Sequence, residues 1–135
     1  MGEVALDPMA SPAAAPTPAE FWRRWNRSAQ QFLQEYAFRP AGALRCPIRA
    51  IFVTFAASAV LHEYVFGIAI GQFQGWQALF FLSQGVAARL TFRSRPTGWG
   101  RVLGTFLTLI FNLAAAALFF QSVNAILPFY SPRPE

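Results

Sequence analysis

The sequence predicts an all-α, polytopic membrane protein. Hydrophobic residues make up 55% of its 135 residues and charged residues only 13%. A transmembrane helix needs about 20 predominantly apolar residues, and three stretches, 48–70, 73–90 and 102–127, approach or exceed that length. The charged residues lie mostly outside these stretches, whereas a soluble domain would carry charge along every element. The pattern therefore favours three spans in a membrane.

The segment before the first span predicts a linker followed by an interfacial helix. Residues 1–17 are rich in Ala and Pro, which is typical of a flexible segment. A helix is expected over 18–38, because Thr17 is a favourable N-cap, Pro18 fits the first helical position and Glu20 completes a capping-box pattern. One face of this helix would collect the apolar residues Trp22, Trp25, Ala29, Phe32, Leu33 and Tyr36. Such an amphipathic helix is expected to lie in the plane of the membrane interface.

The three spans differ in polarity. The stretch 102–127 is the clearest, and Asn112 within it is expected to hydrogen-bond to a neighbouring helix. The stretch 73–90 is shorter and contains Gln77 and Gln84. We expect it to be tilted, partly re-entrant or shielded by neighbouring helices.

The positive charges predict the orientation of the chain. All eleven basic residues are arginine, which indicates a GC-rich genome and hence a bacterial inner membrane. Six lie before the first span or at its start, and four lie at the end of the second span or after it: Arg23, Arg24, Arg27, Arg39, Arg45 and Arg49, then Arg89, Arg93, Arg95 and Arg101. The loop 71–75 carries no charge. The positive-inside rule therefore puts the N-terminal segment and the second loop in the cytoplasm, and the first loop and the tail 128–135 outside. Because the arginines flank spans, nucleic-acid binding is not expected.

His62 is the only histidine, and it lies within the first apolar stretch. Ionisable residues inside a membrane are costly and usually functional, and a pKa of about 6.5 suits histidine for general-base catalysis. The alternative interpretation is a neutral imidazole that hydrogen-bonds between helices. Ser58, one turn earlier, is a candidate partner for the imidazole. Glu63 points about 100° away on a helix, and we expect it to pair with an arginine or to be neutral.

Two motifs resemble those of a known family. The block Phe21-Trp22-Arg23-Arg24-Trp25-Asn26 is followed 36 residues later by His62 in the sequence Leu-His-Glu-Tyr. This pair resembles the membrane-bound O-acyltransferase (MBOAT) family, and the Asn with the His-Glu-Tyr context is similar to its sterol, diacylglycerol and wax-ester branch. The resemblance covers about residues 18–127. It implies the C-terminal, motif-bearing part of a larger helical bundle.

The resemblance implies an acyl-CoA-dependent O-acyltransferase of lipid metabolism. Acyl-CoA would be a co-substrate, the acceptor would be a hydroxyl group, and no bound cofactor or metal is implied. His62 would be the general base, and Asn26 would orient the donor or stabilise negative charge. The candidate substrate-binding residues are Trp22, Arg23, Arg24, Trp25 and Ser58. Membrane lipids, additional N-terminal spans and a second copy of the chain are the expected partners.

Two other functions stay open from the sequence. A non-catalytic membrane fragment or accessory subunit would keep the motifs without a complete tunnel for the acyl chain. A small transport or proton-relay protein would use His62 and Glu63, but it leaves Asn26 unexplained. The sequence shows no metal-ligand cluster, phosphate-binding glycine loop or Ser/His/Asp arrangement.

Overall fold

The computed structural model describes residues 11–25 and 27–127, and every regular element in these residues is helical. The elements are the 3-10 turn η2 (Pro12–Ala14), α1 (Pro18–Arg24), α2 (Arg27–Leu33), the π-helical segment η3 (Gln34–Phe38), the 3-10 turn η4 (Ala43–Arg45), α3 (Pro47–Ile70), α4 (Trp76–Thr91) and α5 (Gly98–Ile126). The predicted all-α class is confirmed.

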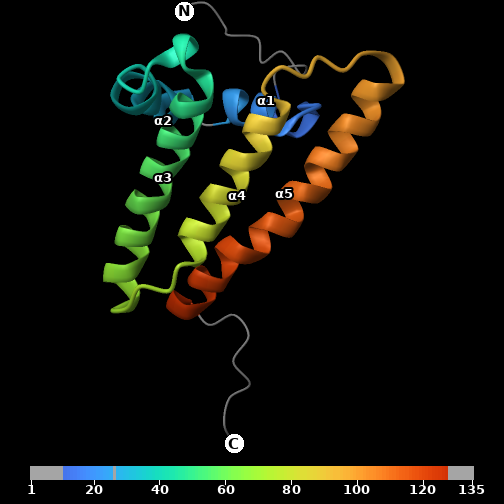
Figure 1. Ribbon diagram of the computed structural model, residues 1–135. Coiled ribbons are helices and arrows are strands. Elements are labelled where there is room, and N and C mark those ends of the chain that lie inside the picture. The colour runs from blue at the N-terminus through green and yellow to red at the C-terminus, as the bar shows by residue number, and fades with distance from the viewer. Residues whose placement is uncertain (1–10, 26, 128–135) are drawn as a thin grey trace, which may run out of the picture.

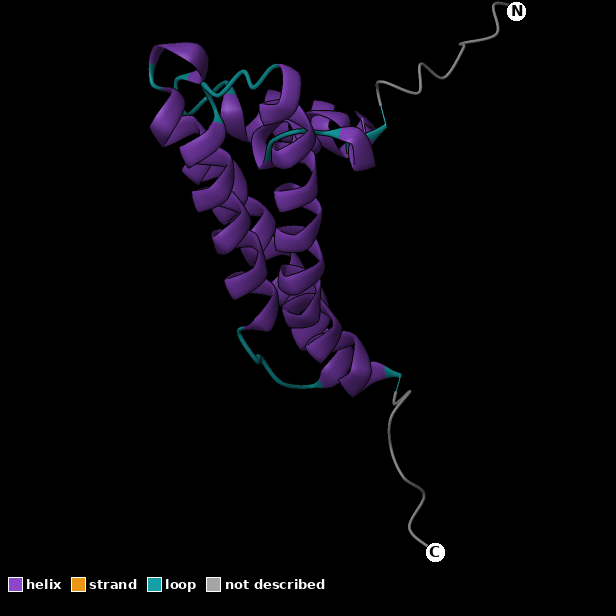
Figure 2. Cartoon of the chain, turned by 90° about the vertical axis from the view of Figure 1, so that its right-hand side faces the viewer, coloured by secondary structure: helices purple, strands orange, loops and turns teal. Residues whose placement is uncertain are grey.

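The three long helices lie side by side in a single layer. Figure 1 shows the layer face on, with α4 between α3 and α5, and Figure 2 shows it edge on as a narrow band. α4 packs against α3 over most of its length, whereas α5 diverges from α4 toward the end that carries α1. The short helices all lie at that one end (Figure 1). Because α4 has neighbours on both sides, its polar side chains can be shielded from lipid.

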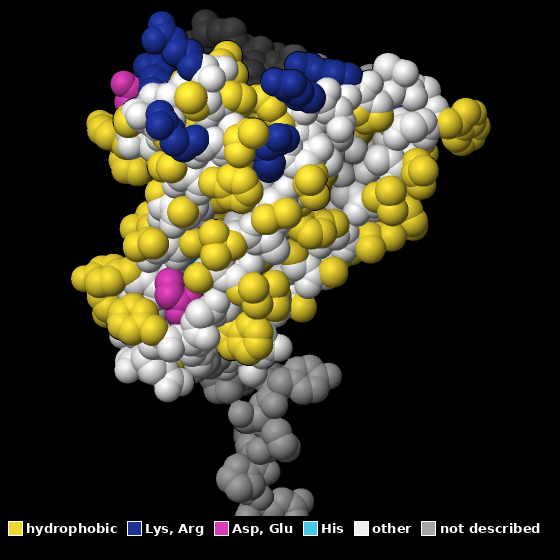
Figure 3. Space-filling view, viewed as in Figure 1, with side chains coloured by type: hydrophobic (Ala, Val, Ile, Leu, Met, Phe, Trp, Pro, Cys, Tyr) yellow, Lys and Arg dark blue, Asp and Glu magenta, His cyan; other side chains and the backbone are white. Residues whose placement is uncertain are grey.

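The surface of the layer fits a membrane. α3 and the segment 98–124 of α5 are long and apolar enough to cross a bilayer. α4 has 16 residues, fewer than the usual length of a span. Large apolar side chains stay exposed along the layer, such as Val60 (70%) and Leu113 (73%). On the face shown in Figure 3, hydrophobic side chains cover the helices and the arginines gather at the end that carries α1 and α2.

The expected helix over 18–38 is divided in the structure. Its start is as predicted, because the Thr17 hydroxyl accepts a hydrogen bond from the Glu20 amide (3.2 Å). Trp25 then leaves the helix with an extended backbone, and α2 begins at Arg27. The rings of Phe32 and Tyr36 contact each other at 4.8 Å and are mostly exposed. A single continuous amphipathic face is therefore the wrong description of this segment.

The expectation of a flexible segment over 1–17 is wrong for residues 11–17. Ala15 is fully buried, and Thr17 is 5% exposed. The reason lies on α5, where a Cβ at Gly104 would come within 2.5 Å of the Pro16 carbonyl oxygen. The absent side chain lets this segment lie directly on the helix. Residues 1–10 and the tail 128–135 lie outside the described residues.

A second glycine sets the distance between α3 and α4, and it yields a prediction. A Cβ at Gly85 would lie 2.9 Å from the Cβ of Phe55, whereas one at Gly100 would have its nearest neighbour at 3.9 Å. We expect Gly85→Ala to be less stable than Gly100→Ala by about 1–3 kcal/mol, because alanine suits both helices but is overpacked at only one site. Thermal unfolding in detergent, followed by tryptophan fluorescence, measures the difference. Equal shifts in the two variants would contradict this close packing.

The arrangement also gives a prediction for topology. The short helices and the connection between α4 and α5 share one end of the layer, while the loop 71–75 and the end of α5 share the other (Figure 1). In a Cys46→Ser background, a cysteine at Gln74 is expected to react with an impermeant external reagent, and one at Thr97 only after the membrane is opened. The reverse labelling pattern would overturn the orientation.

Candidate active site

His62 lies on α3, half-buried against α4. Its ring lies 4.2 Å from the ring of Phe81, at an angle of 36°. Its Nδ1 lies 2.8 Å from the backbone oxygen of Ser58. Because a carbonyl oxygen only accepts, the hydrogen-bond network assigns the ring hydrogen to Nδ1 and the lone pair of the neutral imidazole to Nε2. No group in the described part of the chain hydrogen-bonds to Nε2, so this nitrogen is available to accept a proton.

Ser58 contributes to the site in a different way from the one expected. Its hydroxyl donates to the backbone oxygen of Thr54 (3.1 Å), so the backbone carbonyl of Ser58, and not its side chain, orients His62. This hydrogen bond lies within α3. It therefore gives no support to the alternative interpretation, in which the His62 imidazole hydrogen-bonds to a neighbouring helix.

Trp22 connects the aromatic and arginine block to the histidine. Its ring lies 5.6 Å from Phe55 on α3 and 6.1 Å from Phe81 on α4, measured between ring centroids. Phe81 thus contacts both Trp22 and His62, which are 40 residues apart in the sequence. The fold therefore brings the first helix of the motif and the histidine to the same aromatic side chain.

A chain of hydrogen bonds fixes this arrangement. The Trp22 indole donates to the Gln84 side-chain oxygen (2.9 Å), and the Gln84 amide donates to the Asn112 oxygen (3.1 Å). Gln84 is 1% exposed, so these bonds replace solvation that the buried amide has lost. The expected contact of Asn112 with a neighbouring helix is confirmed. The chain of bonds joins α1, α4 and α5, and sequence reasoning missed its centre although Gln84 stood out in an apolar stretch.

The other candidate binding residues lie at the arginine-rich end. The Arg23 guanidinium lies 5.6 Å from the centroid of the Phe92 ring and donates to the Phe92 carbonyl (3.3 Å). Arg24 forms an ion pair with Glu20. Trp25 stacks on Phe21 and is 50% exposed. The structure thus brings Trp22 and the Ser58 backbone to the surroundings of His62 and places these three residues elsewhere. Asn26 lies outside the described residues.

Glu63 has a structural role that the sequence did not reveal. Its carboxylate accepts hydrogen bonds from the backbone amides of Gln74 (2.8 Å), Gly75 (2.6 Å) and Ala78 (3.2 Å). Ala78 lies in the first turn of α4, where N–H groups lack partners in their own helix, and Gln74 and Gly75 come directly before that helix. The expectation that Glu63 pairs with an arginine is wrong. Both carboxylate oxygens are engaged in this cap, so the proton-relay alternative loses one of its two groups.

Comparison with known proteins identifies the family. The model of the membrane-bound O-acyltransferase family matches residues 12–123. The chain belongs to this family. Members of the sterol branch are among its relatives, as the motifs predicted: mouse sterol O-acyltransferase 2 is 31% identical over 94 residues, which cover 66% of this chain and 18% of that protein.

Two further relatives are also sterol O-acyltransferases by name. Rat sterol O-acyltransferase 2 is 29% identical over 96 residues, 67% of this chain and 18% of its own length. A probable sterol O-acyltransferase 2 of Schizosaccharomyces pombe is 31% identical over 65 residues, 48% of this chain and 14% of its own length. The chain thus matches less than a fifth of each relative. No solved structure matches the chain at a significant level.

Proposed function

We propose that the protein acts as an acyl-CoA-dependent O-acyltransferase that esterifies a lipophilic alcohol, with His62 as the general base. The observation that carries this proposal is the hydrogen bond from Nδ1 to the Ser58 carbonyl, which leaves the Nε2 lone pair of the only histidine without a partner among the described residues. A general base needs such a lone pair and a fixed ring orientation. Family membership supports the same reaction class.

The reaction follows from this geometry. Nε2 of His62 accepts the hydroxyl proton while the acceptor oxygen attacks the thioester carbonyl carbon. The tetrahedral intermediate then collapses, the carbon–sulfur bond breaks, and the departing thiolate takes the proton from His62. The products are an ester and free coenzyme A, and the histidine returns to its neutral form.

The two substrates would approach from different directions. Arg23 is exposed and has no carboxylate partner in the described part of the chain, so it is suited to a coenzyme A phosphate at the cytoplasmic end. The alcohol would enter from the lipid, which the exposed apolar faces adjoin. Trp22 holds the helix that precedes Asn26 against Phe81. We therefore assign Asn26 the role of orienting the thioester or stabilising its developing negative charge.

The acceptor class and the membrane are part of the proposal. The named relatives are sterol O-acyltransferases, so a sterol-like alcohol is the first acceptor to test, with diacylglycerol and a long-chain alcohol beside it. The arginine-only basic composition favours a bacterial inner membrane, although these relatives are eukaryotic. Cell fractionation of the native organism tests the location.

The test of the activity is ester formation in membranes that contain the protein. Membranes are incubated with labelled acyl-CoA and each alcohol, and the labelled ester is quantified. We expect an ester only when the acceptor carries its hydroxyl group, and none with the matched deoxy compound. The purified 135-residue chain by itself is expected to be inactive, because Leu61 and Tyr64 beside His62 are more than half exposed and an acyl chain there would not be enclosed. Absence of ester with every alcohol in membranes that contain the protein would overturn the proposal.

A further inference from the structure

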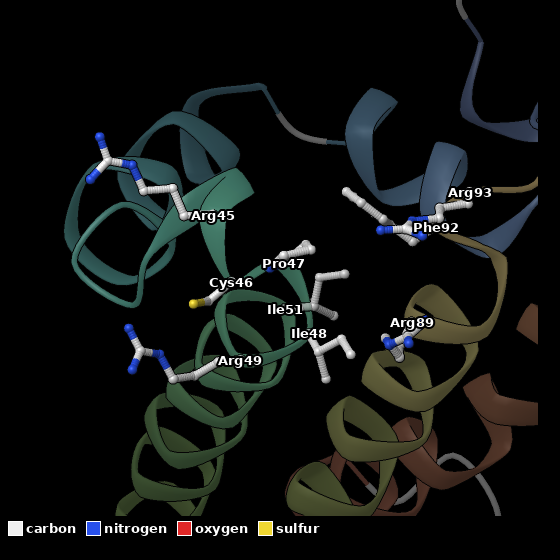
Figure 4. A pocket seen from close by; sticks show the side chains of 9 residues that line it. All are labelled: Arg45, Cys46, Pro47, Ile48, Arg49, Ile51, Arg89, Phe92 and Arg93. Atoms are coloured by element: carbon white, nitrogen blue, oxygen red, sulfur yellow. The ribbon is translucent and has the colours of Figure 1, made fainter.

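A pocket of about 590 Å³ lies between the arginine-rich ends of α3 and α4. Figure 4 shows Ile48 and Ile51 on the α3 side facing Arg89, Phe92 and Arg93 at the end of α4. The pocket thus combines an apolar wall with two cationic side chains. The proposed acyl transfer at His62 does not account for it.

The charge in this pocket is not neutralised within the described residues. The ion pairs in the described part of the chain are Arg24–Glu20 and Arg39–Glu35, and neither includes an arginine of the pocket. Two further arginines of the pocket, Arg45 and Arg49, extend to the far side of α3 in Figure 4. Arg49 is held there by a hydrogen bond to the Ala41 carbonyl (2.6 Å). Arg89 and Arg93 are therefore the groups best placed to contact an anion, and the other two add to the positive potential.

The apolar wall determines which kind of anion fits. Ile48 is 50% exposed, while Ile51 is 6% exposed at the base of the pocket wall. An inorganic phosphate would contact only the guanidinium groups and leave Ile48 uncovered. A phospholipid satisfies both parts, because its phosphate can meet Arg89 and Arg93 while an acyl chain covers Ile48. The pocket also lies where spans meet the predicted cytoplasmic headgroup layer.

We propose that this pocket binds one anionic phospholipid of the cytoplasmic leaflet. Its phosphate contacts Arg89 and Arg93, and one acyl chain lies along Ile48. Bound in this way, the lipid joins the ends of α3 and α4. The proposal is independent of acyl transfer and stands whether or not His62 is a general base.

Native mass spectrometry of the detergent-solubilised chain tests the proposal. The protein is titrated with phosphatidylglycerol and, separately, with phosphatidylcholine of the same acyl chains. We expect one molecule of phosphatidylglycerol to bind saturably to each chain. Phosphatidylcholine should bind much more weakly. Arg93→Gln should lower the affinity for phosphatidylglycerol by about fivefold, since each arginine near an anionic lipid contributes about fivefold. The double variant Arg89→Gln/Arg93→Gln should lower it by roughly 25-fold.

The matched control is Arg95→Gln. Arg95 comes two residues after Arg93, is exposed and lies outside the pocket, so this variant removes the same charge at a different place. It should leave binding unchanged, whereas Ile48→Gln should weaken it without changing the charge. An equal loss in Arg95→Gln, or equal binding of both lipids, would overturn the proposal. Displacement of the lipid by coenzyme A at similar concentration would also overturn it and would assign the pocket to the acyl donor.

Discussion

Replacing His62 with alanine should lower the turnover of the membrane-embedded enzyme by roughly 10²–10⁴-fold, the usual range for removal of a general base. The abundance of the protein and its affinity for acyl-CoA should change little, since His62 is assigned to the proton of the acceptor. The only hydrogen bond of the imidazole in the described residues is to the Ser58 carbonyl of its own helix. Loss of this hydrogen bond should therefore not separate α3 from α4. The measurement is initial ester formation per folded molecule at saturating acyl-CoA.

A second variant separates catalysis from packing. His62→Phe keeps an aromatic ring that can contact Phe81, where the imidazole now lies at 4.2 Å, but it has no nitrogen to accept a proton. If His62 is the base, both variants lose turnover to a similar extent. If the ring matters only for packing, His62→Phe retains activity and His62→Ala does not. Near-normal turnover in His62→Phe would end the catalytic assignment.

The sequence predicted the three long helices well because their signal is local. The apolar stretch 48–70 became α3 (Pro47–Ile70), with Pro47 at its start and Gly71 in a left-handed conformation after its end. The divided segment around Trp25 was not predictable in the same way. Its apolar residues keep a helical period, but periodicity does not show that Trp22 packs on α4 while Phe32 contacts Tyr36 instead.

The site shows the same limit. His62 stood out because a single ionisable residue lay in an apolar stretch, and the structure supplied the carbonyl that orients it. Gln84 was visible as a polar residue, but its partners Trp22 and Asn112 lie 62 and 28 residues away in the sequence. Contacts over such distances are set by how helices pack. A single sequence carries no signal for such contacts.

Glu63 is the clearest case of a role that only the fold reveals, and it gives the second prediction. Gly71 and Gly75 adopt positive φ angles of 81° and 80°, which turn the chain back so that the start of α4 meets the Glu63 carboxylate. Glu63→Ala would leave three amide hydrogens without this partner. Each buried unsatisfied donor costs about 1–3 kcal/mol, and water reaches part of this loop, so we expect a total loss of roughly 2 kcal/mol in unfolding free energy.

Hydrogen exchange measures this effect at the residues concerned. In Glu63→Ala, the amides of Gln74, Gly75 and Ala78 should exchange faster while those in the middle of α3 keep their protection. In Glu63→Gln, these amides should exchange at rates between those of Glu63→Ala and the wild type. The glutamine oxygen still accepts the hydrogen bonds but lacks the charge that strengthens them. Gln72→Ala, in the same exposed loop, is the control and should leave all three amides unchanged. If Glu63→Ala instead abolished ester formation while these amides stayed protected, the carboxylate would belong to the chemistry and not to the cap of α4.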